Sequence, residues 1–281
     1  MILCLAATVA CGDVNAVLER LSEARQLTAD LLVQFTRAAD AANRSVMADT
    51  DESSVAFARQ AEEAKQKVQA DVDALKPLLA QLGYTAETKI LQEFVDRFAA
   101  YRELDRRILD LAVENTNLKA QRLSFGAAQD AANALRDDVK AVVPRAPADK
   151  WRVEALGERA IATVREIQVL QAPHIADADE AVMTRMEKSM ATSETAAREA
   201  LKELATLAQP ASQARLMAAS AALDRFMAVN QDIVSLSRRN TNVRSLALSL
   251  NEKSKAVSAC EDALHRLRDA LAKRGYSGIR Q

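Results

Sequence analysis

The sequence predicts an all-α protein of two tandem up-down four-helix bundles with long antiparallel helices. Glycine and proline are scarce, with 6 and 5 residues in a chain of 281, so the chain can form long helices but few tight turns. Apolar side chains recur at helical spacing along most of the chain. The third observation is an internal repeat, in which residues 48–98 align with residues 176–226 without a gap.

The first copy of the repeat contains four predicted helices. Asp49 and Glu52 form a capping box that begins the second helix, and the acids also suit the positive end of its dipole. Gly83 suits the left-handed C-cap that ends this helix. The four helices are expected over about 14–47, 50–82, 86–123 and, after a bend at 124–126, 127–143.

The second copy repeats this order. Asp177 and Glu180 repeat the capping box, and Pro173 and Pro210 are each expected to follow the end of a helix. The helices are expected over about 150–170, 177–208, 211–250 and 251–273.

Two prolines predict the boundary between the bundles. Pro144 and Pro147 cannot lie inside a helix, so residues 144–149 are expected to be a linker. The predicted bundles then cover residues 14–143 and 150–281. A rival packing, in which helices run continuously from one bundle into the other, stays open at this point.

The first 13 residues are a predicted leader or anchor remnant. Residues 1–11 are apolar and uncharged, but a membrane span needs roughly 20 such residues. The end of a signal or anchor, a lipoprotein cleavage site before Cys11 and an apolar first helical turn are the open interpretations. We expect a periplasmic or other extracytoplasmic protein, attached to a membrane through its N-terminus.

The composition argues against several functions. The net charge is −1 with both signs interspersed, so no basic surface is expected to bind nucleic acid. Two histidines and three cysteines supply poor material for a metal site, and no cofactor is expected. No catalytic motif is present, so the chain is not expected to be an enzyme. Cys260 is expected to be a small apolar core residue, and His174 a surface or packing residue.

Asn-Thr-Asn is the polar motif that recurs in both copies, at 115–117 and 240–242. Asparagine is a mediocre helix former, so its presence within two predicted helices needs a reason. Asn115 and Asn240 continue the 4,3 spacing of apolar positions, whereas Asn117 and Asn242 are expected on another face. Either the buried asparagines set the register of the helices or their amides face a ligand between them.

Three arginines complete the candidate ligand site. Arg122 follows the same seam as Asn115, and a carboxylate would have to pair with it if it points inward. Arg97 and Arg225 occupy matching places beside a core phenylalanine. Each follows an aspartate, so a solvated surface pair competes with a ligand clamp.

The segments 46–54 and 114–120 resemble the four-helix-bundle sensor domain of methyl-accepting chemotaxis receptors. The resemblance covers about 18–143, and more weakly the second copy. It implies a module outside the cytoplasmic membrane that dimerises or works with a membrane signalling partner. It also implies that a small organic acid or amino acid binds near helix interfaces and that a helix displacement carries the signal. The alternative is a structural or protein-interaction bundle with no small ligand.

Overall fold

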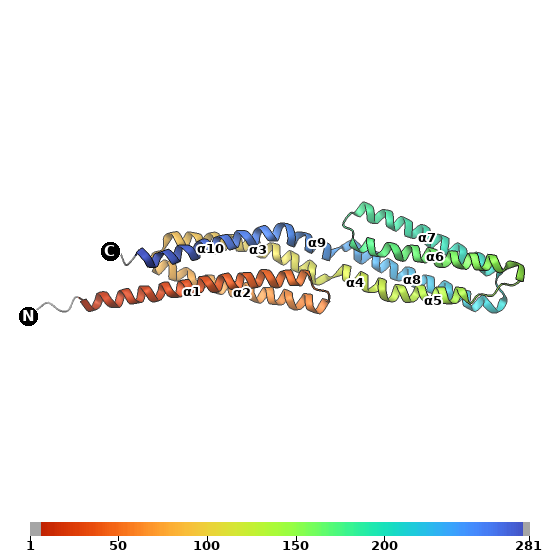
Figure 1. Ribbon diagram of the computed structural model, residues 1–281, viewed down its shortest axis with the longest axis horizontal. Helices are drawn as coiled ribbons and strands as arrows, with labels where there is room; N and C mark the ends of the chain where they lie inside the picture. The colour runs from red at the N-terminus through yellow and green to blue at the C-terminus, as the bar shows by residue number, and fades with distance from the viewer. Residues whose placement is uncertain (1–6, 278–281) are drawn as a thin grey trace, which may run out of the picture. The chain divides into compact units, whose positions relative to one another are not determined.

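The computed structural model describes residues 7–277, with side chains described for 15–274. This part of the chain is almost entirely helical and contains no strand beyond an isolated bridge between Pro144 and Ala208, which confirms the all-α prediction. Figure 1 shows the helices. Their bounds are α1 Ala7–Val46, α2 Asp51–Gln81, α3 Thr85–Glu114, α4 Thr116–Leu123, α5 Gln129–Lys140, α6 Lys150–Ala176, α7 Glu180–Leu207, α8 Gln213–Arg239, α9 Thr241–Leu248 and α10 Ser254–Ser277.

Four short helical turns complete the described chain. Two are 3₁₀ turns and two are π-helical turns. A π-helical turn widens the helix by one residue and is frequent at functional sites. They are η1 Ser124–Ala128 and η4 Ser249–Lys253, which are π-helical, and η2 Pro147–Asp149 and η3 Pro210–Ser212, which are 3₁₀.

The helices form two compact units that do not follow the two copies of the repeat. Unit 1 comprises residues 1–114 and 245–281, and unit 2 comprises 115–244. The expected division into 14–143 and 150–281 is therefore not the division that the contacts give. The reason is that each copy contributes its first three helices to one unit and its last helix to the other.

The 144–149 segment lies inside unit 2 and does not separate units. Arg145 donates its backbone N–H to Leu207 O at 2.7 Å, and Gln209 donates to Val143 O at 2.9 Å. These bonds join the α5–α6 connection to the α7–α8 connection, so the prolines mark a turn between helices of the same unit.

Unit 1 packs α1, α2, α3 and α10 around an aromatic centre. Phe35 of α1 lies edge-on to Tyr101 of α3, with ring centroids 5.2 Å apart, and Phe98 stacks on Tyr101. Cys260 on α10 is fully buried in this core, which confirms the sequence prediction. Its burial raises the pKa of the thiol to about 12.

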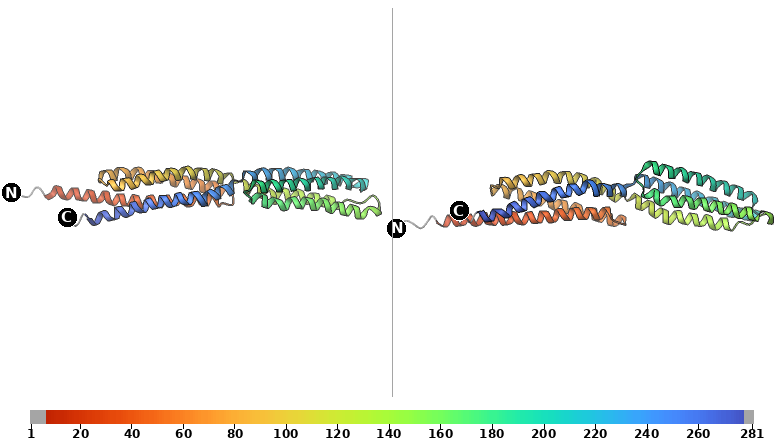
Figure 2. Two further views of the ribbon diagram at one scale, coloured as in Figure 1. Left: turned by 90° about the horizontal axis from the view of Figure 1, so that it is seen from above. Right: turned by 45° about the horizontal axis from the view of Figure 1, so that its top comes forward.

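Unit 2 packs α5, α6, α7 and α8, with α4 against α6 and α8. Figure 2 shows its helices in two further views. Its core is mainly aliphatic, around the buried Phe226. A polar layer crosses this core, because Gln171 donates to Asn230 at 2.9 Å and accepts from Ser124 at 2.7 Å.

Several helix ends differ from the expected ones. The N-cap of α2 is Thr50, which accepts from Ser53 N at 3.1 Å, and the N-cap of α7 is Asp179, so the capping boxes of Asp49 and Asp177 are wrong. Gly83 does have a positive φ of 71° and ends α2 as expected. Pro173 does not end α6, which continues to Ala176.

The predicted leader, residues 1–13, falls partly outside the described part. Residues 1–6 are not described, and α1 begins at Ala7 instead of about Val14. Among the described helices, none combines the length and the apolar character that crossing a membrane requires.

Candidate functional site

The Asn-Thr-Asn motifs interrupt helices instead of continuing them. Asn115 and Asn240 have positive φ values of 50° and 55°, and they are the only non-glycine residues with positive φ in the described chain. Asparagine tolerates this left-handed conformation better than other side chains. The expected helices over 86–123 and 211–250 therefore each end at an asparagine, after Glu114 and after Arg239.

The two motifs lie against each other within unit 2 and bond almost symmetrically; we call residues 115–117 and 240–242 the Asn-Thr-Asn cluster. Thr116 N donates to Thr241 Oγ1 at 3.1 Å, and Thr241 N donates to Thr116 Oγ1 at the same distance. Asn117 N and Asn242 N donate in the same crossed way to each other's Oδ1, also at 3.1 Å. Each motif thus caps the helix that follows the other.

The cluster also holds the α6–α7 connection. Asn117 Nδ2 donates to Ile175 O at 2.6 Å and to Asn240 Oδ1 at 2.8 Å. Asn240 Nδ2 donates to Asp177 O at 2.7 Å. These asparagine side chains therefore bond to one another and to backbone carbonyls of the α6–α7 connection. Asn117 and Asn242 do not face away from Asn115 and Asn240 as expected.

One amide group in the cluster is left over. Asn242 Nδ2 donates to Asn115 Oδ1 at 2.9 Å, but the buried Asn115 Nδ2 has no hydrogen-bond partner. The crossed bonds of the cluster are therefore symmetric, but the two equivalent amide groups differ. Asn240 Nδ2 has an acceptor, whereas Asn115 Nδ2 has none.

The hydrogen bonds described above for the cluster involve none of the three predicted arginines. Arg122 is exposed on α4, and Arg225 is exposed on α8. Arg97 belongs to unit 1, where it pairs with Glu93 and donates to Ala259 O at 2.5 Å, so it ties α3 to α10. Its partner is therefore Glu93, one turn back on α3, and not the preceding Asp96.

His174 is a packing residue of unit 2. It is fully buried and bonds to Ser237 Oγ at 2.6 Å and to Glu187 Oε1 at 2.9 Å. Arg238 also pairs with Glu187, and its hydrogen bond lowers the pKa of that carboxyl. This network joins α6, α7 and α8, and both ring nitrogens of His174 are hydrogen-bonded to side chains of the protein.

Unit 1 contains a buried charge cluster that the sequence analysis missed, and we call it the lysine–aspartate triad. Asp105 of α3 lies 2.9 Å from Lys65 Nζ of α2 and 3.0 Å from Lys253 Nζ of η4. All three side chains are at most 3% exposed. Burial lowers the pKa of Lys253, against the opposing effect of Asp105. One carboxylate thus contacts two buried ammonium groups.

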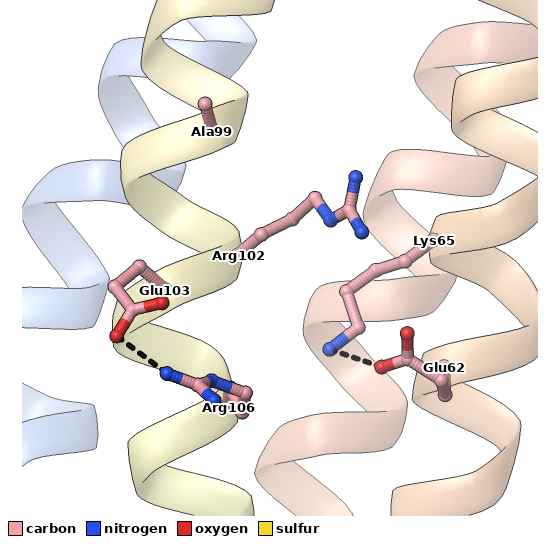
Figure 3. A pocket seen from close by; sticks show the side chains of 6 residues that line it. All are labelled: Glu62, Lys65, Ala99, Arg102, Glu103 and Arg106. Carbon is pink, nitrogen blue, oxygen red and sulfur yellow. Dashed lines mark hydrogen bonds and ion pairs between the residues drawn. The ribbon is translucent and has the colours of Figure 1, made fainter.

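A charged pocket of about 360 Å³ opens beside the triad, between α2 and α3 (Figure 3). Arg102 projects from α3 across the pocket towards α2. Lys65 reaches Glu62 at 2.7 Å, and Arg106 reaches Glu103 at 2.8 Å. The pocket therefore presents three cations and two carboxylates, and Lys65 connects it to the buried Asp105.

A spacing signal could have revealed part of this site. Asp105 lies four residues after Tyr101 and three before Ile108, the same spacing that placed Asn115 among core positions. Lys253 had no such signal, because the π-helical turn η4 shifts the register of the helix and brings a lysine inward.

No family model matches the chain, and no curated protein matches it.

Proposed function

We propose that this protein is a non-enzymatic, extracytoplasmic sensory module of the chemoreceptor type, which binds a small organic acid or amino acid and transmits binding by displacing helices. In this proposal each unit is a four-helix bundle, and the protein acts as a homodimer or with a membrane signalling partner. The uncharged apolar start of the chain and the resemblance of residues 46–54 and 114–120 to sensor domains support the location and the class.

The charged pocket of unit 1 is the observation that carries the proposal. Arginine binds carboxylates through paired N–H donors, so Arg102 and Arg106 suit an organic acid. The carboxylates of Glu62 and Glu103 would accept hydrogen bonds from the ammonium group of an amino acid. Side chains of both signs on two helices match a zwitterion better than they match an apolar compound.

The triad offers a route for the signal within unit 1. A ligand carboxylate near Lys65 would compete with Glu62 and Asp105 for the ammonium group. Because Asp105 also holds Lys253, a change at Lys65 alters the attraction between α3 and the turn that begins α10. Small shifts of packed helices are a recurring way of transmitting binding.

A thermal-shift screen with organic acids and amino acids tests the proposal. A ligand at 100 times its dissociation constant stabilises the folded state by about 2.7 kcal/mol, so the melting temperature should rise by several degrees. Arg102→Gln and Arg106→Gln should remove this rise. Arg107→Gln, which alters an exposed arginine of α3 outside the pocket, should keep it.

Two results would count against binding in this pocket. The first is a panel in which no compound stabilises the protein at millimolar concentration. The second is a stabilising compound whose effect is unchanged in both pocket variants.

A structural or interaction role without a small ligand is the second candidate. The Asn-Thr-Asn cluster favours it, because its side chains bond to one another and to the α6–α7 connection. In that case the asparagines define the packing of unit 2, and the screen should find no ligand for either unit.

A further inference from the structure

The two copies of the repeat meet inside each unit. In unit 1 the second copy, residues 150–281, supplies α10 to the three helices of the first copy, residues 14–143. In unit 2 the first copy supplies α4 and α5 to α6 and α8 of the second. Val139 and Leu264, which occupy matching positions, are buried in the cores of unit 2 and unit 1. Each copy therefore completes a core that the other copy begins.

Polar contacts between the copies are reciprocal. Ser124 Oγ of the first copy donates to Gln171 of the second at 2.7 Å, and Ser249 Oγ of the second copy donates to Asn43 of the first at 3.1 Å. The two serines are 125 positions apart and the two amides 128, which are the separations that relate the copies after and before a three-residue deletion. The crossed bonds of the Asn-Thr-Asn cluster follow the same rule, so both copies use one set of matched positions to bind each other.

The ion pairs between the copies do not follow this reciprocity. Four described ion pairs join the copies, and each takes its carboxylate from the first copy and its cation from the second. They are Glu87–Arg274 at 2.7 Å, Glu93–Arg266 at 2.7 Å, Asp105–Lys253 at 3.0 Å and Asp138–Arg215 at 2.9 Å. The interface is therefore matched in its polar contacts and complementary in its charges.

The matched positions show what would happen if a copy paired with itself. Arg215 of the second copy aligns with Glu87 of the first. In a pair of two first copies Glu87 would take the place of Arg215 near Asp138, and two carboxylates would approach each other. In a pair of two second copies Arg215 would take the place of Glu87 near Arg274. Like charges brought together at an interface suppress the wrong pairing.

The buried triad of unit 1 gives the same preference. Asn230 of the second copy aligns with Asp105 of the first, and Ala128 of the first aligns with Lys253 of the second. Two second copies would therefore bury Lys253 beside an uncharged amide, which is strongly destabilising. Two first copies would lack this ion pair altogether, because alanine stands in place of the lysine.

We infer that the surfaces joining the copies form a selective protein–protein interface, through which the first copy binds the second without the covalent connection and neither copy binds itself. The partner that fits the first copy is therefore the second copy, from the same chain or from another molecule of this protein. The inference does not depend on the proposed sensory function.

The connection between the copies offers a place to cut the folded protein. Pro147 and Ala148 are exposed, and the described backbone bond from Asp149 N to Ala146 O is local to the turn. A specific protease site inserted between Pro147 and Ala148 lets the full chain fold before it is cut. Circular dichroism of the uncut variant checks that the insertion preserves the fold.

After the cut, the two parts should stay together in size-exclusion chromatography at micromolar concentration. The melting temperature of the cut protein should fall on tenfold dilution, because its unfolding then includes dissociation. The melting temperature of the uncut variant should not change. Native mass spectrometry of the cut protein, separated in urea and refolded, should find complexes of one first and one second copy and no pairs of identical copies.

Charge variants of the cut protein test the selectivity. Glu87→Arg places an arginine against Arg274 and should weaken the pairing by about tenfold or more, whereas adding Arg274→Glu should restore most of it. Glu63→Arg alters an exposed pair within the first copy and should leave the pairing unchanged. The inference is overturned if the cut parts separate at micromolar concentration, if identical copies pair as readily as different ones, or if Arg274→Glu does not rescue Glu87→Arg.

Discussion

Two single residues, Asn115 and Asn240, show why asparagine occurs where α3 and α8 end. Asn115 and Asn240 adopt the left-handed backbone conformation, and their side chains then bond across the cluster. A side chain with a short amide can satisfy both requirements at once. The motif is therefore explained by backbone geometry and by polar pairing together.

We expect Asn115→Ala to destabilise the protein more than Asn115→Gly. Alanine in the left-handed region costs about 1–2 kcal/mol, whereas glycine adopts it freely and loses only the hydrogen bond from Asn242. Urea denaturation of both variants measures the difference. Equal destabilisation would show that backbone conformation is not what selects asparagine here.

The lysine–aspartate triad predicts a strong effect of a conservative change. Asp105→Asn removes the shared carboxylate, so Lys253 is left buried without a counter-charge and Lys65 keeps only the half-exposed Glu62. The free energy of unfolding should therefore fall by about 3–5 kcal/mol. Lys253→Met is the matched control, because Asp105 and Lys65 remain paired and little stability should be lost. A mild effect of Asp105→Asn in urea denaturation would contradict this description of the triad.

A charged contact joins the start of α3 to the last turns of α10. Glu87 at the start of α3 accepts from Arg274 Nε at 2.7 Å and from its Nη2 at 2.8 Å. Arg274 also lies 4.5 Å from the ring centre of Tyr84. The bonds from Arg274 lower the pKa of Glu87 from its ordinary value of 4.5.

The lowered pKa predicts a pH dependence of stability. The Glu87–Arg274 contact stabilises the folded state fully above the unfolded pKa near 4.5, and this contribution is lost as the pH falls through the lower folded pKa. Glu87→Gln should therefore make stability fall less steeply in acid than in the unaltered protein. Glu63→Gln, in an exposed pair with Arg59, is the control and should leave the acid profile unchanged. Denaturation series across this pH range measure both.

At the scale of the whole molecule, the units and the copies of the repeat divide the chain differently. Residues 115–244 contain every helix of the unit 2 core. The fragment 14–143, the first bundle expected from the repeat, lacks α10, which supplies Cys260, Leu264 and Leu267 to the core of unit 1. It also separates α4 and α5 from their partners.

We expect the fragment 115–244 to fold by itself and the fragment 14–143 not to do so. The first keeps its apolar faces covered, whereas the second exposes the faces that α6, α8 and α10 cover in the intact protein. Thermal unfolding followed by circular dichroism should be cooperative for 115–244 and broad or absent for 14–143. Cooperative folding of 14–143 would show that the copy, and not the contact unit, is the independent element.

Sequence patterns predicted what depends on local interactions. The helical spacing of apolar residues, the turn at Gly83 and the burial of Cys260 and Phe226 are all confirmed. The positions of Asn115 and Asn240 at buried sites are confirmed as well, although the helix breaks there were not predicted. These features follow from side-chain size, polarity and backbone preference within a few residues.

Only the tertiary structure decided which helices share a core. A helix can bury its apolar face against any partner with a matching face, so the pattern could not show that α10 completes unit 1 or that the two Asn-Thr-Asn motifs meet. The same holds for Lys65, Asp105 and Lys253, which are far apart in the chain and form one ion cluster because α2, α3 and η4 pack together. The sequence by itself determined an all-α protein with an internal repeat, whereas the tertiary structure decided how the copies exchange helices and where buried charges meet.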